Sequence, residues 1–175
     1  MTRRSRFEQL VRPVLGDLYR FACRLTRDPV AAEDLLQQAL LRGLDRVEQL
    51  HDDGAFRVWQ SRVLYTTFVN GRQRREAMPV DEAALERAAG AHDRPSPERD
   101  AMDRQLGGRI GDALDALPPD QREAVWLVDG QGFKFGEAAD VLGVPPGTVA
   151  SRVARARAAL RTRLAAVAAD EGVGR

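Results

Sequence analysis

Apolar residues recur every three or four positions along most of this 175-residue chain. That spacing is the period of an amphipathic α-helix, and no stretch shows the alternation of apolar and polar residues that indicates a half-buried strand. The sequence therefore predicts an all-α fold. We expect two small helical domains, residues 1–78 and 105–170, joined by a flexible linker at 79–104, where prolines interrupt the helical pattern and acidic residues outnumber basic ones.

Three helices are expected in the amino-terminal domain. The first covers about Phe7 to Leu25, on the spacing of its apolar residues. The second begins after Asp28, a residue type that often caps helices, and continues to about Leu50. The third covers residues 56–76, which are apolar early and basic at the end.

Composition excludes several functional classes. No run approaches the roughly 20 apolar residues that a membrane span needs, and no apolar signal region follows the charged start, so we expect a cytoplasmic protein without a membrane partner. Cys23, His51 and His92 are too far apart in sequence to indicate a metal site. A glycine-rich phosphate loop and a nucleophile-base cluster are also missing from the sequence. We therefore expect a protein that is not an enzyme and that holds no cofactor or metal.

The segment FGEAADVLGVPPGTVASRVARAR, residues 135–157, has the spacing of a helix-turn-helix. Gly143 can adopt the positive φ that the turn requires, and Thr148 can cap the second helix. In such a motif the start of the second helix enters the major groove of DNA. Four residues are placed to reach bases and phosphates there: Thr148, Ser151, Arg152 and Arg155.

Five arginines and no acidic residue lie between Thr148 and Leu164, although the net charge of the chain is only +1. On a helical wheel these arginines flank a narrow apolar seam, and small residues occupy the opposite face. The arrangement suits a surface that approaches DNA closely. Taken alone, the helix also fits an alanine-rich amphipathic helix whose arginines only face solvent.

The third helix combines aromatic residues with arginines. Trp59, Tyr65 and Phe68 occur at helical spacings, with basic residues among and after them. Aromatic rings with neighbouring cations suit the capture of single-stranded DNA, because an unstacked base offers a ring face and a phosphate. The alternative is that these rings belong to the core, and for Trp59 the core is the expected place.

Three segments together, residues 31–47, 54–75 and 117–160, resemble in order and spacing the extracytoplasmic-function sigma factors, the smallest class of bacterial RNA polymerase specificity subunits. The resemblance implies that residues 1–78 are sigma region 2, which binds core polymerase and recognises and melts the -10 promoter element. It implies that residues 105–170 are region 4, which recognises the -35 element. The implied function is promoter-specific transcription initiation.

The resemblance also assigns roles to residues. The face implied to dock on the clamp helices of the largest catalytic subunit comprises Asp34, Gln37, Gln38, Leu41 and Arg42. The residues implied to contact the -10 element are His51, Asp52, Asp53, Phe56, Arg62, Thr66, Asn70, Arg72, Arg74 and Arg75. The polymerase flap, promoter DNA and an anti-sigma protein are the other implied partners. On periodicity alone, the α-helical face at residues 34–42 equally fits a solvated surface.

The sequence departs from the family pattern at three positions. Thr66 stands where many members have asparagine, and Asn70 where they have aspartate. Ala150 occupies a position that is often basic in the recognition helix. The runner-up hypothesis is a stand-alone helix-turn-helix regulator, which would bind a palindromic duplex site without polymerase.

Overall fold

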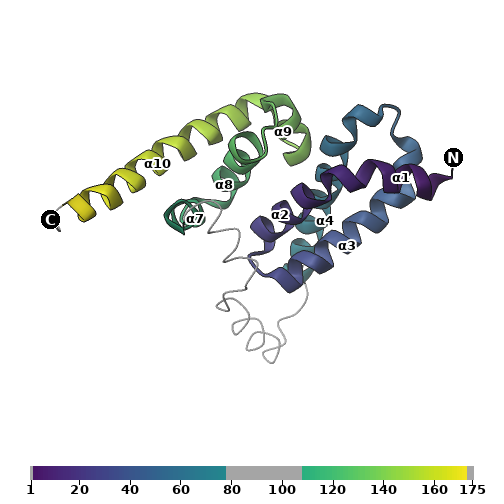
Figure 1. Cartoon of the computed structure of the whole chain (residues 1–175), viewed down its shortest axis with the longest axis horizontal. Helices are drawn as coiled ribbons and strands as arrows, with labels where there is room; N and C mark the ends of the chain where they lie inside the picture. The colour runs from purple at the N-terminus through teal and green to yellow at the C-terminus, as the bar shows by residue number, and fades with distance from the viewer. Residues whose placement is uncertain (1, 78–107, 173–175) are drawn as a thin grey trace. The chain divides into compact units, whose positions relative to one another are not determined.

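The computed structural model describes residues 2–77 and 108–172, and within those ranges it contains helices and turns but no strand (Figure 1). The all-α prediction is confirmed. The chain divides into two units, Met1–Ser96 and Pro97–Arg175. The expected linker at 79–104 and the domain boundaries beside it lie outside the described residues.

The amino-terminal unit is a small helical bundle. Its helices are α1 (Arg3–Val11), α2 (Leu15–Thr26), α3 (Pro29–Arg46) and α4 (Phe56–Ala77), with short 3-10 turns η1 (Arg12–Val14), η2 (Val47–Gln49) and η3 (Asp53–Ala55). Helix α3 packs against both α2 and α4, and these helices run side by side in Figure 1. The largest fully buried apolar side chains of the unit are Leu18, Phe21, Val47 and Leu64.

The predicted single helix from Phe7 to Leu25 is wrong, because the structure divides it at Pro13. Helix α1 ends at Val11, and α2 begins at Leu15 after the η1 turn. Proline lacks an N–H to donate, and its ring clashes with the carbonyl four residues earlier, so it kinks or breaks an α-helix, and here the α-helix is interrupted.

The second helix begins as predicted and ends earlier than expected. The Asp28 side chain caps α3 by accepting a hydrogen bond from the Val30 amide at 3.2 Å, with proline at the first helical position. Helix α3 ends at Arg46 rather than near Leu50, and the η2 turn occupies the difference.

Helices α3 and α4 approach each other closely at Gly43. The Gln60 side chain of α4 is fully buried, and its Nε2 donates to the Ala39 carbonyl oxygen of α3 at 2.9 Å. A Cβ atom at Gly43 would lie only 2.1 Å from Gln60 Oε1. Glycine at this position therefore makes room for the buried amide.

The carboxy-terminal unit is built around one long helix. Its elements are α7 (Gly108–Asp115), α8 (Pro119–Val125), the π-helical turn η4 (Trp126–Gly130), α9 (Phe135–Leu142) and α10 (Pro146–Gly172). Helix α10 contacts α7, α8 and α9. Its predicted apolar seam is confirmed, since Val149, Val153 and Ala156 are buried and Leu160 packs beside them.

The helix-turn-helix is formed by α9 and α10. Gly143 ends α9 with φ of 67°, which confirms its predicted role in the turn. The prediction that Thr148 caps the next helix is wrong. Helix α10 begins at Pro146, and the Thr148 amide donates to the Pro145 carbonyl oxygen at 2.9 Å. Proline suits the first helical position because it has no N–H that needs a partner there.

A bidentate ion pair joins the π-helical turn to α10. Arg157 donates from Nε to Asp129 Oδ2 at 2.9 Å and from Nη2 to Asp129 Oδ1 at 2.6 Å. These hydrogen bonds lower the pKa of the Asp129 carboxyl below its ordinary value, and they outweigh partial burial, which raises it. Both side chains remain about half exposed, so the pair contributes modestly to stability.

Replacing Asp129 with asparagine is expected to lower the free energy of unfolding by up to about 1 kcal/mol at pH 7, the range of a solvent-accessible ion pair. Because folding depresses this pKa, the stabilisation is present above the carboxyl pKa of the unfolded chain, about 4, and is lost as the pH falls through the lower folded value. Urea denaturation of both proteins at pH 7 and at low pH measures this. The control is Asp140→Asn, at an exposed α9 carboxylate that forms no ion pair with the described residues. A difference between wild type and Asp129→Asn that persists undiminished in acid would contradict the expectation.

Candidate functional site

The exposed side of α10 carries the residues predicted to contact duplex DNA. Arg155 and Ala154 are exposed, and Thr148, Ser151 and Arg152 are half-buried. The Ser151 hydroxyl donates to the Thr148 carbonyl oxygen at 2.9 Å. The first turns of α10 therefore present small side chains and a guanidinium group, as a helix that enters a groove requires.

Three of the arginines on α10 are bonded within their own unit. Arg152 lies 3.3 Å from Asp120 of α8, and its side chain is only 22% exposed. Arg157 pairs with Asp129, and Arg163 donates to the Ala116 carbonyl oxygen at 3.2 Å. Sequence reasoning missed these contacts, because each partner lies far from its arginine in the chain.

Arg155 and Arg161 differ from the other three. Both are exposed, and neither forms a hydrogen bond or ion pair with a residue in the described parts of the chain. Their positive charge is therefore the most available to a polyanion.

One exposed stripe follows α3. Asp34, Gln37, Gln38 and Leu41 are all exposed, at the three- and four-residue spacings that place them on one face. Leu41 is 64% exposed, so its apolar side chain is available to a partner. Val30, 69% exposed, lies one turn before Asp34 and extends the stripe.

Other α3 residues lie differently from the prediction or face another element. Arg42 is half-buried, and its Nη1 donates to Thr67 Oγ1 of α4 at 3.2 Å, so it belongs partly to the interface between the two helices. Leu35 is the buried leucine of this turn, and Leu36 is half-buried.

A second exposed stripe follows α4. Arg62, Thr66, Asn70 and Arg74 are exposed and four residues apart, so they lie one above the other on the helix. The Thr66 hydroxyl donates to the Arg62 carbonyl oxygen at 2.8 Å. Two neighbouring arginines are exposed and bonded within the helix: Arg72 to Glu76, and Arg75 to the Gly71 carbonyl oxygen.

The two helices share a shallow cavity of about 330 Å³. Asp34 and Gln38 of α3 line it together with Phe68, Arg74 and Arg75 of α4. The structure thus brings residues from the predicted polymerase face beside residues from the predicted -10 face.

Trp59, Tyr65 and Phe68 of α4 are half-buried rather than free. Trp59 packs against the core, with its ring centroid 5.9 Å from that of Phe56, in agreement with the core position predicted for it. Tyr65 stacks on Phe21 of α2 with ring centroids 6.4 Å apart and planes 12° from parallel. Stacking inside the unit leaves only part of each ring accessible.

The prediction that Phe56 contacts the -10 element is wrong. Its side chain is only 2% exposed, and its ring meets Phe7 edge-on at a centroid distance of 5.7 Å. Phe56 begins α4 and closes a buried cluster with Phe7, Val47 and Leu50, so the ring cannot reach DNA.

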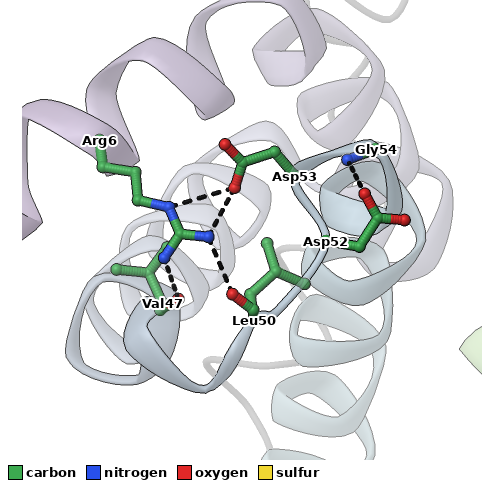
Figure 2. Close-up of polar contacts among 6 residues, drawn as sticks. All are labelled: Arg6, Val47, Leu50, Asp52, Asp53 and Gly54. Atoms are coloured by element: carbon green, nitrogen blue, oxygen red, sulfur yellow. Dashed lines mark hydrogen bonds and ion pairs between the residues drawn. The ribbon is translucent and has the colours of Figure 1, made fainter.

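The loop before α4 is held by an arginine that sequence reasoning missed. Figure 2 shows Arg6 of α1 reaching Asp53, with Nε at 3.1 Å and Nη2 at 2.6 Å from Oδ1. Arg6 also donates to the carbonyl oxygens of Val47, at 3.3 Å, and Leu50, at 2.8 Å. Asp52 accepts the Gly54 amide at 2.9 Å and so caps the η3 turn. His51 is exposed.

The described residues provide neither a membrane-spanning helix nor a metal site. None of their helices is long and apolar enough to cross a membrane. No group of three His, Cys, Asp or Glu side chains among them is arranged to hold a metal ion.

Comparison with known proteins gives matches to two family models in order along the chain. Residues 10–77 match Sigma-70 region 2, and residues 107–160 match Sigma-70, region 4. The predicted domains each contain one of these matches.

Curated relatives match over most of the chain. The ECF RNA polymerase sigma factor SigE of Mycolicibacterium smegmatis is 38% identical over 164 residues, which cover 91% of this chain and 62% of SigE, so the chain spans less than two thirds of that relative. The RNA polymerase sigma-E factor of Streptomyces coelicolor is 36% identical over 161 residues, which cover 91% of this chain and 86% of the relative.

A solved structure matches in fold across both units. The sigma factor RpoE from Bartonella quintana, crystallised in complex with the anti-sigma factor NepR, aligns with a TM-score of 0.68 and 26% identity. The alignment covers 90% of this chain and 96% of that chain.

Proposed function

Because the chain belongs to the extracytoplasmic-function RNA polymerase sigma factors, we propose that it binds core RNA polymerase and directs transcription initiation at particular promoters. The observation that carries the proposal is the presence of region 2 and region 4 in one chain, in that order. A stand-alone regulator would leave the region 2 match unexplained. The proposed role is not enzymatic and places the protein in the cytoplasm.

The stripe on α3 is the proposed contact with polymerase. Asp34, Gln37, Gln38 and Leu41 form a mixed polar and apolar face that suits the side of another helix, and in this family that helix belongs to the clamp of the largest catalytic subunit. Arg42 is proposed to border this face from its position beside α4. The polymerase flap is the proposed partner of the carboxy-terminal unit.

The stripe on α4 is the proposed contact with the -10 element. Arg62, Arg74 and their neighbours place positive charge along one face, which suits a phosphate backbone. Thr66 and Asn70 lie between these arginines and are the proposed polar contacts to bases. The remaining proposed contacts are Arg72, Arg75 and the loop residues His51, Asp52 and Asp53.

The start of α10 is the proposed contact with the -35 element. Arg155 is the principal candidate, because it is exposed and its guanidinium group can bind a phosphate of the DNA backbone beside the bases. Thr148 and Ser151 lie earlier on the helix, where bases are contacted in a helix-turn-helix. Arg152, held by Asp120, is the proposed fourth contact.

Replacing Arg155 with alanine is expected to weaken promoter binding by the holoenzyme about tenfold and to reduce the slope of log affinity against log salt by about one. Arg157→Ala is the matched control, since that arginine lies on the same helix but is bonded to Asp129. Titration of fluorescent promoter DNA, selected from a random pool by the wild-type holoenzyme, measures both effects over a series of salt concentrations. Equal slope changes for the two variants would contradict the assignment.

The function itself is tested by run-off transcription with purified core polymerase. We expect new start sites on genomic DNA templates when the protein is added, and no site-specific binding of DNA by the protein alone. Unaided binding to a palindromic site, with no added initiation, would favour the stand-alone regulator.

An anti-sigma protein is a proposed further partner. The support is that RpoE of Bartonella quintana, which shares the fold across nearly its whole length, was crystallised with one. Affinity purification of this chain from its own cells tests whether such a protein accompanies it.

A further inference from the structure

We propose that Arg6 is a positioning residue for promoter recognition, because its guanidinium group fixes the loop at residues 51–55 in one conformation. The inference rests on the proposed function and extends it to a residue of α1 that lies 47 positions before Asp53. None of the family-derived contacts includes Arg6.

Arg6 forms hydrogen bonds to residues both before the loop and within it. The guanidinium group donates to the Val47 carbonyl oxygen at the start of the η2 turn and to the Leu50 carbonyl oxygen at its end. It then donates twice to Asp53 at the start of the η3 turn. One rigid, planar group therefore sets the distance between the two turns, as Figure 2 shows.

The Arg6 contacts also determine how the loop groups are presented to DNA. The Asp53 carboxylate is committed to Arg6, and the Asp52 carboxylate to the Gly54 amide. Phe56 is buried. Asp52 and Asp53 would therefore meet DNA while bonded to Gly54 and Arg6, beside the exposed imidazole of His51.

A carboxylate repels the phosphates of a DNA backbone unless its charge is neutralised. Arg6 supplies that neutralisation for Asp53, because the two side chains are 26% and 54% exposed and in direct contact. Losing the arginine would therefore release the loop and leave a negative charge where the strand approaches.

The experiment compares Arg6→Ala with a matched control, Arg4→Ala. Arg4 lies on the same helix, is 81% exposed, and contacts Glu8 one turn away. Arg6→Lys forms the third variant, since lysine keeps the charge but lacks the planar fork that reaches several acceptors at once.

Two measurements are made on each full-length variant. Hydrogen exchange of the free protein reports how firmly residues 50–55 are held. Binding of the reconstituted holoenzyme to fork-junction DNA, with each single-stranded -10 base varied in turn, reports the preference for the base that the wild type selects.

We expect Arg6→Ala to speed exchange in the loop and to reduce the base preference about tenfold, the effect of losing hydrogen bonds to a charged group. Arg6→Lys should recover only part of it, Arg4→Ala should match wild type, and all variants should bind core polymerase equally. Unchanged exchange would show that Arg6 does not hold the loop. Faster exchange with an unchanged base preference would show that recognition needs no fixed loop. A parallel loss of core polymerase binding would show that Arg6 has a general structural role. Each of these three outcomes would overturn the proposal.

Failure of the proposed function gives a different pattern. The wild-type holoenzyme would then select no -10 base at all. The exchange measurement would still show whether Arg6 holds the loop in the free protein.

Discussion

Replacing Leu41 with aspartate is expected to weaken binding to core RNA polymerase about thirtyfold or more, the effect of losing an apolar residue central to an interface. Leu41 is 64% exposed in the middle of the α3 stripe, so it contributes little to the fold, and the substitution leaves the stability of the free protein nearly unchanged. Covering this position with a partner would then bury an unpaired charge. Fluorescence anisotropy of labelled protein titrated with core polymerase measures the loss.

The matched control is the same substitution at Leu15, which is 40% exposed on α2 and outside the α3 stripe. Leu15→Asp should bind core polymerase as wild type does. An equal loss in both variants would mean that added negative charge, rather than the α3 face, determines the result.

Replacing Gly43 with alanine is expected to lower the free energy of unfolding of the amino-terminal unit by about 2 kcal/mol, through overpacking and the displaced Gln60 amide. The new methyl group would overlap Gln60 Oε1, and the amide is fully buried with its hydrogen bond to Ala39, so it cannot simply turn into solvent. Urea denaturation followed by circular dichroism measures the change.

Gly71 offers the opposite case on α4. A Cβ atom there would meet nothing within 4 Å, so Gly71→Ala should stabilise the helix by about 0.5 to 1 kcal/mol through its higher helix propensity. If Gly43→Ala proved as stable as Gly71→Ala, the close approach of α3 and α4 at Gly43 would not be required.

Features that depend on residues close together in the sequence were predictable. Asp28 marks the start of α3, Gly143 marks the end of α9, and the seam of α10 follows from the spacing of its apolar residues. Each depends on residues within a few positions of one another, where hydrogen bonding and periodicity act directly. The exposure of Leu41 followed from the same reasoning.

Features that depend on contacts between distant segments were not predictable. The burial of Phe56 depends on Phe7, and the orientation of Arg152 depends on Asp120. Arg6 was no candidate at all, since nothing near it in the sequence indicates that Asp53 is its partner. The break at Pro13 is a different case, because its cause is visible in the sequence even though the apolar spacing continues across it.

The π-helical turn at Trp126–Gly130 has a consequence for aligning relatives of this protein. Such a turn holds one residue more than an α-helix of the same length, closed here by the Gln131 amide donating to the Trp126 carbonyl oxygen at 2.9 Å. A chain one residue shorter between these positions would wind as ordinary α-helix, and the residue in place of Asp129 would shift around the helix axis from the position that meets Arg157 with both oxygens. We therefore expect that relatives with one residue fewer in this segment also lack the acid at 129 or the base at 157.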